Sequence, residues 1–461
     1  MSKELNKHIL SSLSFECTHE QLALIDELIA FCSGASTQEV FILNGYAGTG
    51  KTSIVAGLVE KLHVIKKKSV MLAPTGRAAK VLSNFSKEKA STIHRHIYYP
   101  KAIGQKLHFT LQKNKHSNTI FFVDEASMID DQSSVSDGQS LLEDLIHYVF
   151  SGKNCRLILI GDPAQLPPVK TTISPALQED YLTQKYLLHV ASFQLKKVMR
   201  QADESGILHN ATLLRRQLDT EHNEPLQFNL SSFPDLQLLK QPDDIIDAFE
   251  TAFSPENIEN STVILRSNKR ANTYNEQMRK RILYKEERLE KGDLLMVVKN
   301  NYFWLKPNSD AGFIANGDII EIVKVHRFEQ LYGFDFAQVN VRMIDYPDMS
   351  AFDTILLLNT LNIDAPALSY EDSGKLYTAI EKDYAQLKTK SMRFFAIKNN
   401  KHFNALQVKY AYAITCHKAQ GGQWDTVFVE KPYAPKGYDD DMLRWMYTAF
   451  TRAKKKLYLI G

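Results

Sequence analysis

The chain has 461 residues with a formal net charge of +3, 44% hydrophobic and 24% charged residues, which is typical of a soluble globular protein with two or three domains. No apolar run approaches the roughly 18 residues of a membrane span, and the N-terminal segment lacks the apolar core of a signal peptide. The four cysteines are scattered without a CxxC pair. This argues against a zinc ribbon or a disulfide framework and indicates a reducing, cytoplasmic location.

The first half of the chain alternates short apolar runs with stretches that read as helices. Buried strands are expected at 40–45, 69–75, 119–126 and 155–162, with helices over 51–65 and 76–85. Continuous apolar strands joined by helices predict a parallel sheet covered on both faces, which binds ligands at the carboxyl ends of its strands. The segment 101–119 reads as an inserted β-hairpin.

The α/β pattern resumes in the second half. It predicts a strand and a helix at 261–283, a strand, a helix and a strand at 409–432, and a helix and a final strand at 442–461. Between about Gly292 and Phe403, short alternating strands with NG and GD turns predict a small barrel inserted into this second α/β domain. Within it, the segment 350–390 carries no motif that can be placed.

Basic residues gather in one segment of the first half. From Arg77 to Thr119 there are nine lysines and arginines against one acid, Glu88, with aromatic residues interleaved. Such a segment suits a phosphate backbone, because each neutralised phosphate releases counterions. A solvated surface is the alternative interpretation of a charge run taken alone.

A phosphate-binding loop is expected at 45–52, which matches G-x-x-x-x-G-K-[ST] between a predicted strand and helix. The glycines let backbone N–H groups approach phosphates, and the helix N-terminus adds positive potential. Lys51 is expected to reach the β- and γ-phosphates of ATP, and the Thr52 hydroxyl to ligate Mg²⁺. The expected nucleotide contacts are Gly45, Ala47, Gly48, Thr49, Gly50, Lys51, Thr52 and Ser53.

Two further strand ends supply candidate catalytic groups. Asp124 is expected to be the second protein ligand of the metal, and Glu125 to polarise a water for attack on the γ-phosphate. An isolated Asp-Glu pair after a strand usually caps a helix, but its position about 70 residues after a phosphate loop favours hydrolysis. Asp162 and Gln165 lie at the tip of the next strand, where Gln165 could sense the γ-phosphate through a hydrogen bond.

Eight short blocks follow one another in a fixed order. They are GYAGTGKTS, APTGRAAKVL, STIHRHI, VDEASMI, GDPAQLPPV, VMRQ, AITCHKAQGGQWDTVFVE and YTAFTRAKKKLYLIG. This ordered set resembles superfamily 1 helicases, and more narrowly the superfamily 1B branch of RecD-like and phage Dda-like DNA helicases. The resemblance runs from about Thr18 to the last residue.

The resemblance implies two RecA-like parallel-sheet domains, with a β-hairpin called the pin in the first and an SH3-like barrel in the second. The expected boundaries are 1–200 for the first domain with the pin at about 97–119, 201–292 with 406–461 for the second, and 293–405 for the barrel.

The resemblance also implies roles for single residues around the nucleotide. Gln21 would read the adenine, and Gln420 would be a second nucleotide contact. Arg200 and Arg452 would reach the γ-phosphate as arginine fingers. Because Arg452 comes from the second domain, hydrolysis would require the two domains to close.

On the nucleic-acid side, the resemblance implies contacts to the DNA backbone that do not read sequence. The expected contacts are Thr75, Arg77, Lys80, Thr92, His94, Arg95, Thr415, His417 and Lys418. Tyr98, Phe109 and Trp424 are candidate surfaces on which bases could stack.

The sequence therefore predicts an ATP- and Mg²⁺-dependent DNA helicase that moves 5′ to 3′ along single-stranded DNA as a monomer, with a role in DNA replication, repair or recombination. The expected partners are single-stranded DNA, duplex junctions and a single-strand-binding protein. Two alternatives stay open, namely a translocase that displaces proteins without opening duplex and a motor that moves on RNA. A small-molecule kinase would leave the last fifty or so residues unexplained.

Overall fold

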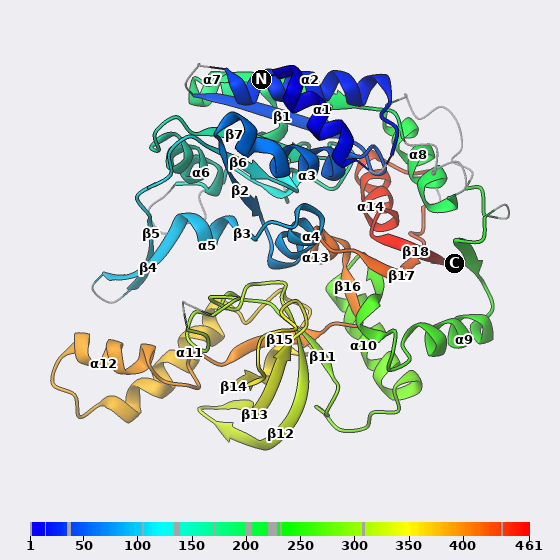
Figure 1. The fold of residues 1–461 in the computed structure, drawn as a ribbon. Helices are drawn as coiled ribbons and strands as arrows, with labels where there is room; N and C mark the ends of the chain where they lie inside the picture. The colour runs from blue at the N-terminus through cyan, green and yellow to red at the C-terminus, as the bar shows by residue number, and fades with distance from the viewer. Residues whose placement is uncertain are drawn as a thin grey trace.

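The computed structural model of the chain describes residues 2–13, 15–34, 38–103, 106–132, 139–169, 171–198, 205–219, 228–230, 233–306, 309–434 and 437–461. Its framework is two parallel sheets and one closed barrel (Figure 1). We call the first sheet with its helices the first lobe, and the second sheet with its helices the second lobe. In the part of the chain that is described, no helix is long and apolar enough to cross a membrane.

The first lobe is built on six parallel strands in the order β3-β2-β6-β7-β1-β8. The strands are β1 (Glu39–Gly45), β2 (Lys68–Ala73), β3 (Ala90–Thr92), β6 (Thr119–Val123), β7 (Arg156–Gly161) and β8 (His189–Leu195). The four strands predicted in this region are confirmed, with ends that shift by up to three residues. The polar turns that follow β1, β2, β6 and β7 therefore lie along one edge of the sheet.

Alternate side chains of β1 enter two different cores. Val40 and Ile42 pack on one face of the sheet, and Phe41 and Leu43 on the other. This is the period-2 alternation of a strand buried on both sides. The sheet face that carries Phe41 is covered by α1 (Ser2–Ser12), α2 (His19–Ser33), α3 (Lys51–Lys61) and η1 (Leu62–Ile65). The opposite face is covered by α5 (Ile93–Ile97), α6 (Leu141–Phe150), η3 (Pro175–Leu177) and α7 (Glu179–Tyr186). The remaining elements are α4 (Gly76–Ser86) and η2 (Ala126–Met128).

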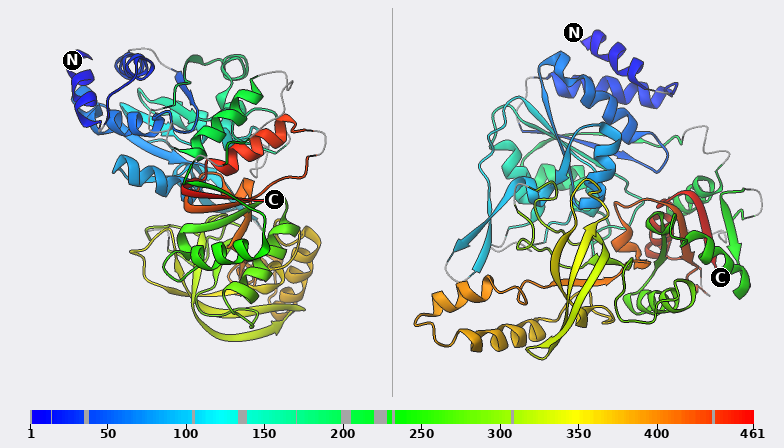
Figure 2. Two further views of the ribbon diagram at one scale, coloured as in Figure 1. Left: turned by 90° about the vertical axis from the view of Figure 1, so that its right-hand side faces the viewer. Right: turned by 60° about the horizontal axis from the view of Figure 1, so that its bottom comes forward.

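The predicted hairpin is present but starts earlier and is shorter than 101–119. It consists of the antiparallel strands β4 (Tyr98–Ile103) and β5 (Lys106–Leu111). The hairpin projects from the first lobe on the side of the molecule where α12 lies (Figure 2).

The second lobe contains five parallel strands in the order β16-β10-β17-β18-β9. They are β9 (Leu236–Leu239), β10 (Ser261–Leu265), β16 (Ala413–Thr415), β17 (Trp424–Glu430) and β18 (Ala453–Ile460). The helices are α8 (Gly206–Leu218), α9 (Pro242–Ala252), η5 (Ile258–Asn260), α10 (Asn268–Gln277), η6 (Met278–Ile282), α13 (Cys416–Ala419) and α14 (Asp440–Phe450). The strand–helix and helix–strand pairs predicted at 261–283 and 442–461 are confirmed.

The inserted barrel is also confirmed, but two of its features differ from the prediction. Its strands are β11 (Leu294–Val297), β12 (Ile319–Leu331), β13 (Phe334–Met343), β14 (Phe352–Leu357) and β15 (Leu406–Tyr410), so the last strand lies beyond the predicted end at 405. The unplaced segment contains η7 (Leu358–Thr360), α11 (Tyr370–Glu381) and η8 (Lys382–Tyr384), and α12 (Lys390–Lys398) begins at its end. Ser369 and Thr389 cap the two helices through their hydroxyls, a signal that the sequence carried.

A buried ion network holds the barrel where the chain enters and leaves it. Asp293 precedes β11, and its carboxylate accepts hydrogen bonds from Arg279 at 3.1 and 3.0 Å and from Lys285 at 3.0 Å. Tyr412, which follows β15, donates its hydroxyl to Asp293 at 2.9 Å and accepts from the Leu294 amide at 3.2 Å. The point where the chain enters the barrel and the point where it leaves are therefore joined through the carboxylate of Asp293.

Candidate functional site

The predicted phosphate-binding loop joins β1 to α3, and two of its glycines have left-handed backbone conformations. Gly48 has φ 76°, and Gly50, the N-cap of α3, has φ 86°. A Cβ atom at Gly50 would lie 2.7 Å from the Gln21 side-chain nitrogen, and one at Gly45 would lie 2.8 Å from the Lys51 side chain. The loop therefore needs glycine for its backbone conformation at Gly48 and Gly50 and for space at Gly45 and Gly50.

Lys51 lies at the centre of this loop and faces two carboxyl groups. Its Nζ donates to the carbonyls of Gly45 at 2.5 Å and Tyr46 at 2.9 Å. Burial raises the pKa of Asp124 to about 6 and that of Asp162 above its usual range, and the Lys51 ammonium opposes both shifts. One cation thus influences the carboxyl groups that follow both β6 and β7, and its contact with the phosphates stays a prediction.

Three predicted catalytic residues meet at the boundary between the lobes. The Arg452 guanidinium, from the second lobe, lies 3.6 Å from Glu125 Oε1. In the amide orientation that satisfies its neighbours, Gln165 donates to Glu125 Oε2 at 3.3 Å and accepts from Arg452 Nη2 at 3.1 Å. Thr448 holds the arginine by accepting from its Nε at 3.1 Å. The cluster joins groups from β6, β7 and α14 that lie far apart in the sequence.

The other predicted nucleotide contacts differ in how far they are buried, and one of them is not described. Gln21 is buried beneath the loop, where its amide donates to the Thr49 carbonyl and accepts from the Thr18 amide, both at 2.9 Å. Its role in reading adenine stays a prediction. Thr52 and Ser53 are half-buried in the first turn of α3. Arg200 lies outside the described residues.

The loop after β7 contacts α14 of the second lobe through three hydrogen bonds. Arg444 donates to the Pro163 carbonyl, and Thr448 accepts from the Leu166 amide at 2.8 Å. Tyr447 donates to Asp162 at 2.6 Å. Sequence reasoning missed all three residues of α14, although their spacing of three and four positions puts them on one helix face.

Gln420, predicted to contact the nucleotide, contacts the same loop. Its amide donates to the Leu166 carbonyl at 2.6 Å. It also lines the cavity that holds the predicted DNA contacts. A nucleotide contact by Gln420 therefore stays a prediction.

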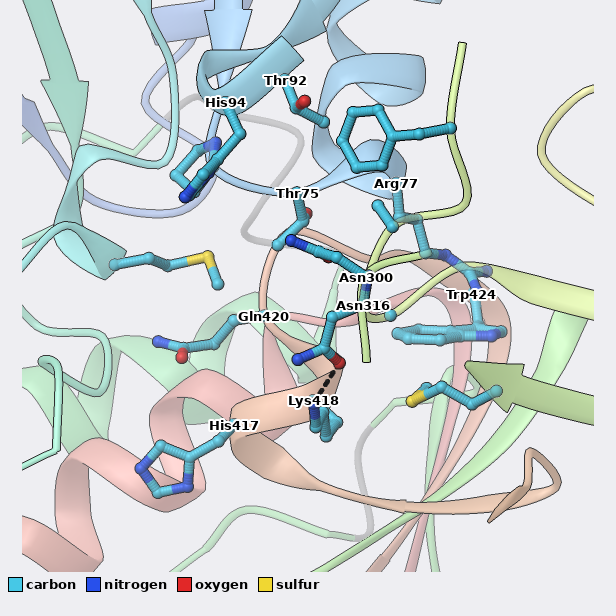
Figure 3. A pocket seen from close by; sticks show the side chains of 16 residues that line it. Thr75, Arg77, Thr92, His94, Asn300, Asn316, His417, Lys418, Gln420 and Trp424 are labelled. Carbon is cyan, nitrogen blue, oxygen red and sulfur yellow. Dashed lines mark hydrogen bonds between the residues drawn. The ribbon is translucent and has the colours of Figure 1, made fainter. Parts of the chain in front are cut away.

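Most of the predicted DNA contacts line two neighbouring cavities of about 300 and 290 Å³. The first is formed between both lobes and the barrel (Figure 3). Its predicted members are Thr75, Arg77, Thr92, His94, His417 and Lys418, and the barrel adds Asn300, Phe313 and Asn316. Lys80 and Arg95 line the second cavity. Thr415 is the N-cap of α13 and lines neither.

The threonines also have a structural role in this groove. Thr75 caps α4 by accepting from the Ala78 amide, and Thr92 caps α5 by accepting from the Arg95 amide, both at 3.2 Å. Each therefore starts a helix at the cavity wall, Thr92 as the last residue of β3 and Thr75 two residues after the end of β2. Their capping bonds fix the positions of Arg77 and His94, which follow them by two residues.

Three of the predicted DNA-binding cations contact the barrel. Lys80 lies 3.5 Å from Asp345, Arg95 donates to the Ser309 carbonyl at 3.1 Å, and Lys418 donates to Asn316 at 2.6 Å. Sequence reasoning gave the barrel no part in this groove. Burial lowers the pKa values of Lys418, His94 and His417, because desolvation disfavours their charged forms.

Two of the three candidate stacking residues already contact other side chains, one through its ring and the other through its hydroxyl. Trp424 is 3% exposed, and the Arg77 guanidinium lies 3.9 Å from its ring centre. Tyr98 is buried and donates its hydroxyl to Asp144 at 2.6 Å. The Phe109 side chain lies outside the described part of the structure. Phe313, which sequence reasoning missed, stacks on Tyr302 and lines both cavities.

Two family models match the chain. An AAA domain model matches residues 16–227, and a UvrD-like helicase C-terminal domain model matches residues 410–460. The first match covers the phosphate loop and the strand ends that follow it. The second covers Gln420, α14 and Arg452.

Several proteins are similar in sequence. The ATP-dependent RecD2 DNA helicase of Deinococcus radiodurans is 29% identical over 195 residues, which is 42% of this chain and 23% of that protein. The ATP-dependent DNA helicase dda of Enterobacteria phage T4 is 30% identical over 147 residues, or 31% of each chain. The uncharacterized protein R530 of Acanthamoeba polyphaga mimivirus is 22% identical over 522 aligned positions, covering 95% of this chain and 98% of that protein. The chain thus spans less than a third of the two named helicases.

A solved structure of two coordinating Pif1 helicases at forked double-stranded DNA resembles this fold, with a TM-score of 0.50 and 15% identity over 96% of this chain and 92% of that one. At this identity the likeness concerns the fold alone. Fold and site together define a two-lobed P-loop protein with a barrel inserted in its second lobe. The two family matches and these relatives agree with the resemblance of the ordered motifs to superfamily 1B helicases of the RecD-like and Dda-like branch.

Proposed function

We propose that this protein is an ATP-dependent DNA helicase that moves 5′ to 3′ along single-stranded DNA and separates the duplex ahead of it. The observation that carries the proposal is the contact of Arg452 with Glu125 and Gln165 beside the phosphate loop. A nucleotide in that loop would be enclosed by both lobes. Its binding and release would therefore change how the lobes fit together, which is what a motor requires.

At the nucleotide, each group has a role that follows from its position. Lys51 would exchange its two carbonyl bonds for charge-assisted bonds to phosphate oxygens. Glu125 would orient a water for attack, and Arg452 would neutralise the charge that develops on the transferred group. Gln165 touches both residues and would register whether the γ-phosphate is present. Arg200 and Gln21 keep their proposed roles at the γ-phosphate and the adenine.

The residues at the site fit a magnesium ion. Thr52 and Asp124 offer a hydroxyl and a carboxylate, the hard oxygen ligands that Mg²⁺ accepts together with phosphate oxygens and waters. Within the described ranges there is no group of three His, Cys, Asp or Glu residues that could hold a metal by protein side chains alone. A bound Mg²⁺ would offset phosphate charge.

On the DNA side, the same lobes that enclose the nucleotide also line the groove. Arg77 and His94 come from the first lobe, and His417 and Lys418 from the second, so a change in lobe spacing would shift their grip on the strand. Contacts of this kind hold phosphates and do not select sequence. The β4–β5 hairpin is the proposed wedge at the duplex junction, and the polarity follows from the resemblance to the family.

We also propose a division of the chain into domains. It assigns 1–200 to the first domain, with the hairpin as an insertion, and the rest to the second domain apart from the barrel. The continuity of β15 with the barrel supports a barrel that ends at 410. A monomer would suffice, because the phosphate loop and Arg452 belong to one chain. A single-strand-binding protein stays a proposed partner.

The test is the ATPase rate with and without single-stranded DNA, together with unwinding of duplexes that carry a 5′ or a 3′ tail. We expect stimulation by DNA and opening of only the 5′-tailed duplex, both abolished in Lys51→Ala. Opening of only the 3′-tailed duplex would contradict the polarity. Stimulation without any opening would indicate a translocase, and stimulation by RNA alone would indicate an RNA-directed motor.

A further inference from the structure

One tyrosine of the second lobe contacts the backbone of the phosphate loop itself. Tyr447 lies on α14 and is 1% exposed. Its hydroxyl accepts a hydrogen bond from the Ala47 amide at 2.9 Å and donates one to Asp162 at 2.6 Å. Asp162 in turn accepts from the Ala164 amide at 2.9 Å. A single hydroxyl thus connects the loop after β1, the loop after β7 and the second lobe.

The direction of both hydrogen bonds is fixed by chemistry. An amide can only donate, so the Tyr447 oxygen must accept from Ala47. Burial and the neighbouring Asp162 raise the pKa of Tyr447 far above its usual range, so the phenol keeps its proton and donates it to the carboxylate. The chain of bonds therefore runs in one direction, from the loop amide through the hydroxyl to Asp162.

The same helix carries the arginine that completes the proposed active site. Arg452 follows α14 and lies five residues after Tyr447. A displacement of α14 would consequently move the arginine away from Glu125 and withdraw the hydroxyl from Ala47 at the same time. Lys51, which holds the other side of the loop, also influences the charge of Asp162.

We propose that Tyr447 is a positioning residue that couples nucleotide binding at the phosphate loop to closure of the second lobe. The inference rests on the proposed function, because it names the contact through which that motor transmits the state of its nucleotide. When a bound phosphate reorders the amides of the loop, the hydrogen bonds of the Tyr447 hydroxyl to Ala47 and Asp162 are either kept or broken. The docking of α14, and with it the position of Arg452, follows.

The test compares Tyr447→Phe with a control in which the same chemistry occurs elsewhere. Tyr412 is also 1% exposed, accepts from a backbone amide (Leu294) and donates to a buried carboxylate (Asp293), but it lies at the barrel junction. Tyr412→Phe removes an equivalent hydroxyl without touching the nucleotide site. A loss of stability alone would affect both variants.

Two readouts are measured in the wild type and both variants. The first is the DNA-stimulated ATPase, for which we expect Tyr447→Phe to lower kcat by about tenfold or more, the size of one buried hydrogen bond, with KM for ATP within about threefold. The second is hydrogen exchange in peptides of α14 with and without a non-hydrolysable ATP analogue. We expect the analogue to slow this exchange in the wild type and in Tyr412→Phe but not in Tyr447→Phe.

The outcomes separate this inference from the proposed function. A DNA-stimulated kcat of Tyr447→Phe within twofold of the wild type, or protection of α14 by the analogue in that variant, would overturn the coupling and leave the helicase proposal intact. If DNA fails to stimulate the wild type, the helicase proposal falls and hydrogen exchange alone decides the coupling. If Tyr447→Phe does not fold, Asp162→Ala removes the acceptor at the other end of the same contact and should give the same two effects.

Discussion

Replacing Asp293 with Asn tests how strongly a buried charge stabilises the place where the chain enters and leaves the barrel. The Asp293 side chain is fully buried, and its partner Arg279 is 7% exposed. Asn keeps the shape but removes the charge that balances Arg279 and Lys285, leaving Arg279 with Glu290 at 4.0 Å. Breaking a buried ion pair from one side costs about 3–5 kcal/mol, because the remaining cation stays desolvated.

Glu430→Gln is the matched control. Glu430 receives a two-pronged contact from Arg270, at 2.9 Å from Nε and 2.5 Å from Nη2, but the arginine is 51% exposed and the glutamate 28%. Exposed pairs of this kind contribute about 0–1 kcal/mol. The two variants thus remove the same charge from similar geometry and differ in burial.

Hydrogen exchange in peptides of β11 and β15 is the suitable assay, because the lobes and the barrel need not unfold together. A loss of 3 kcal/mol should speed exchange there by about two orders of magnitude in Asp293→Asn, since each 1.4 kcal/mol is a factor of ten. Glu430→Gln should change exchange in the strands it touches by less than about tenfold. Equal effects of the two variants would refute the reasoning that burial decides the strength of the pair.

Three further predictions concern the site and the groove. Arg452→Lys keeps the charge but loses the fork, so we expect DNA-stimulated kcat to fall by about 10³-fold with little change in KM for ATP, and a fall below tenfold would contradict the arginine-finger role. Lys418→Ala should reduce the slope of log affinity against log salt for single-stranded DNA by about 0.7, measured by fluorescence anisotropy, and an unchanged slope would exclude a phosphate contact. Burial raises the pKa of Asp318 to about 8, so the folded protein binds a proton more tightly than the unfolded chain and loses stability as pH rises from about 4 to 8, by roughly 1.4 kcal/mol per unit. Asp318→Asn, which can still accept from the Ala315 amide, should therefore raise Tm over the wild type at pH 8 and not at pH 4, and an equal Tm at both would contradict the raised pKa.

Much of the first lobe was predictable because its signals are local. A continuous apolar strand followed by a glycine-rich turn and a helix specifies its own conformation, and β1, the loop and α3 formed as the pattern indicated. The meeting of Glu125, Gln165 and Arg452 was predictable only through the ordered motifs, because no local pattern relates residues that distant.

Other features depend on tertiary contacts that no sequence pattern predicts. The contacts of Lys80, Arg95 and Lys418 with the barrel arise from how the barrel sits against the lobes, which its strands do not encode locally. Trp424 was a candidate stacking surface, but its ring is covered by Arg77. The helices α11 and α12 were missed although their capping residues were visible, since alternating strands dominated the interpretation of the whole insert.

The strand order of the second lobe has a consequence for the making of the protein. All six strands of the first sheet lie between Glu39 and Leu195, so all of them can pair before the second half of the chain is synthesised. In the second sheet, β10 pairs with β16 and β17, and β9 pairs with β18, all of them encoded near the end. At ribosomal rates of about 5–20 residues per second, β9 and β10 must wait for roughly ten seconds or more while the barrel is made. During that time two apolar strands have no neighbours, which makes the nascent second lobe a natural client for chaperones.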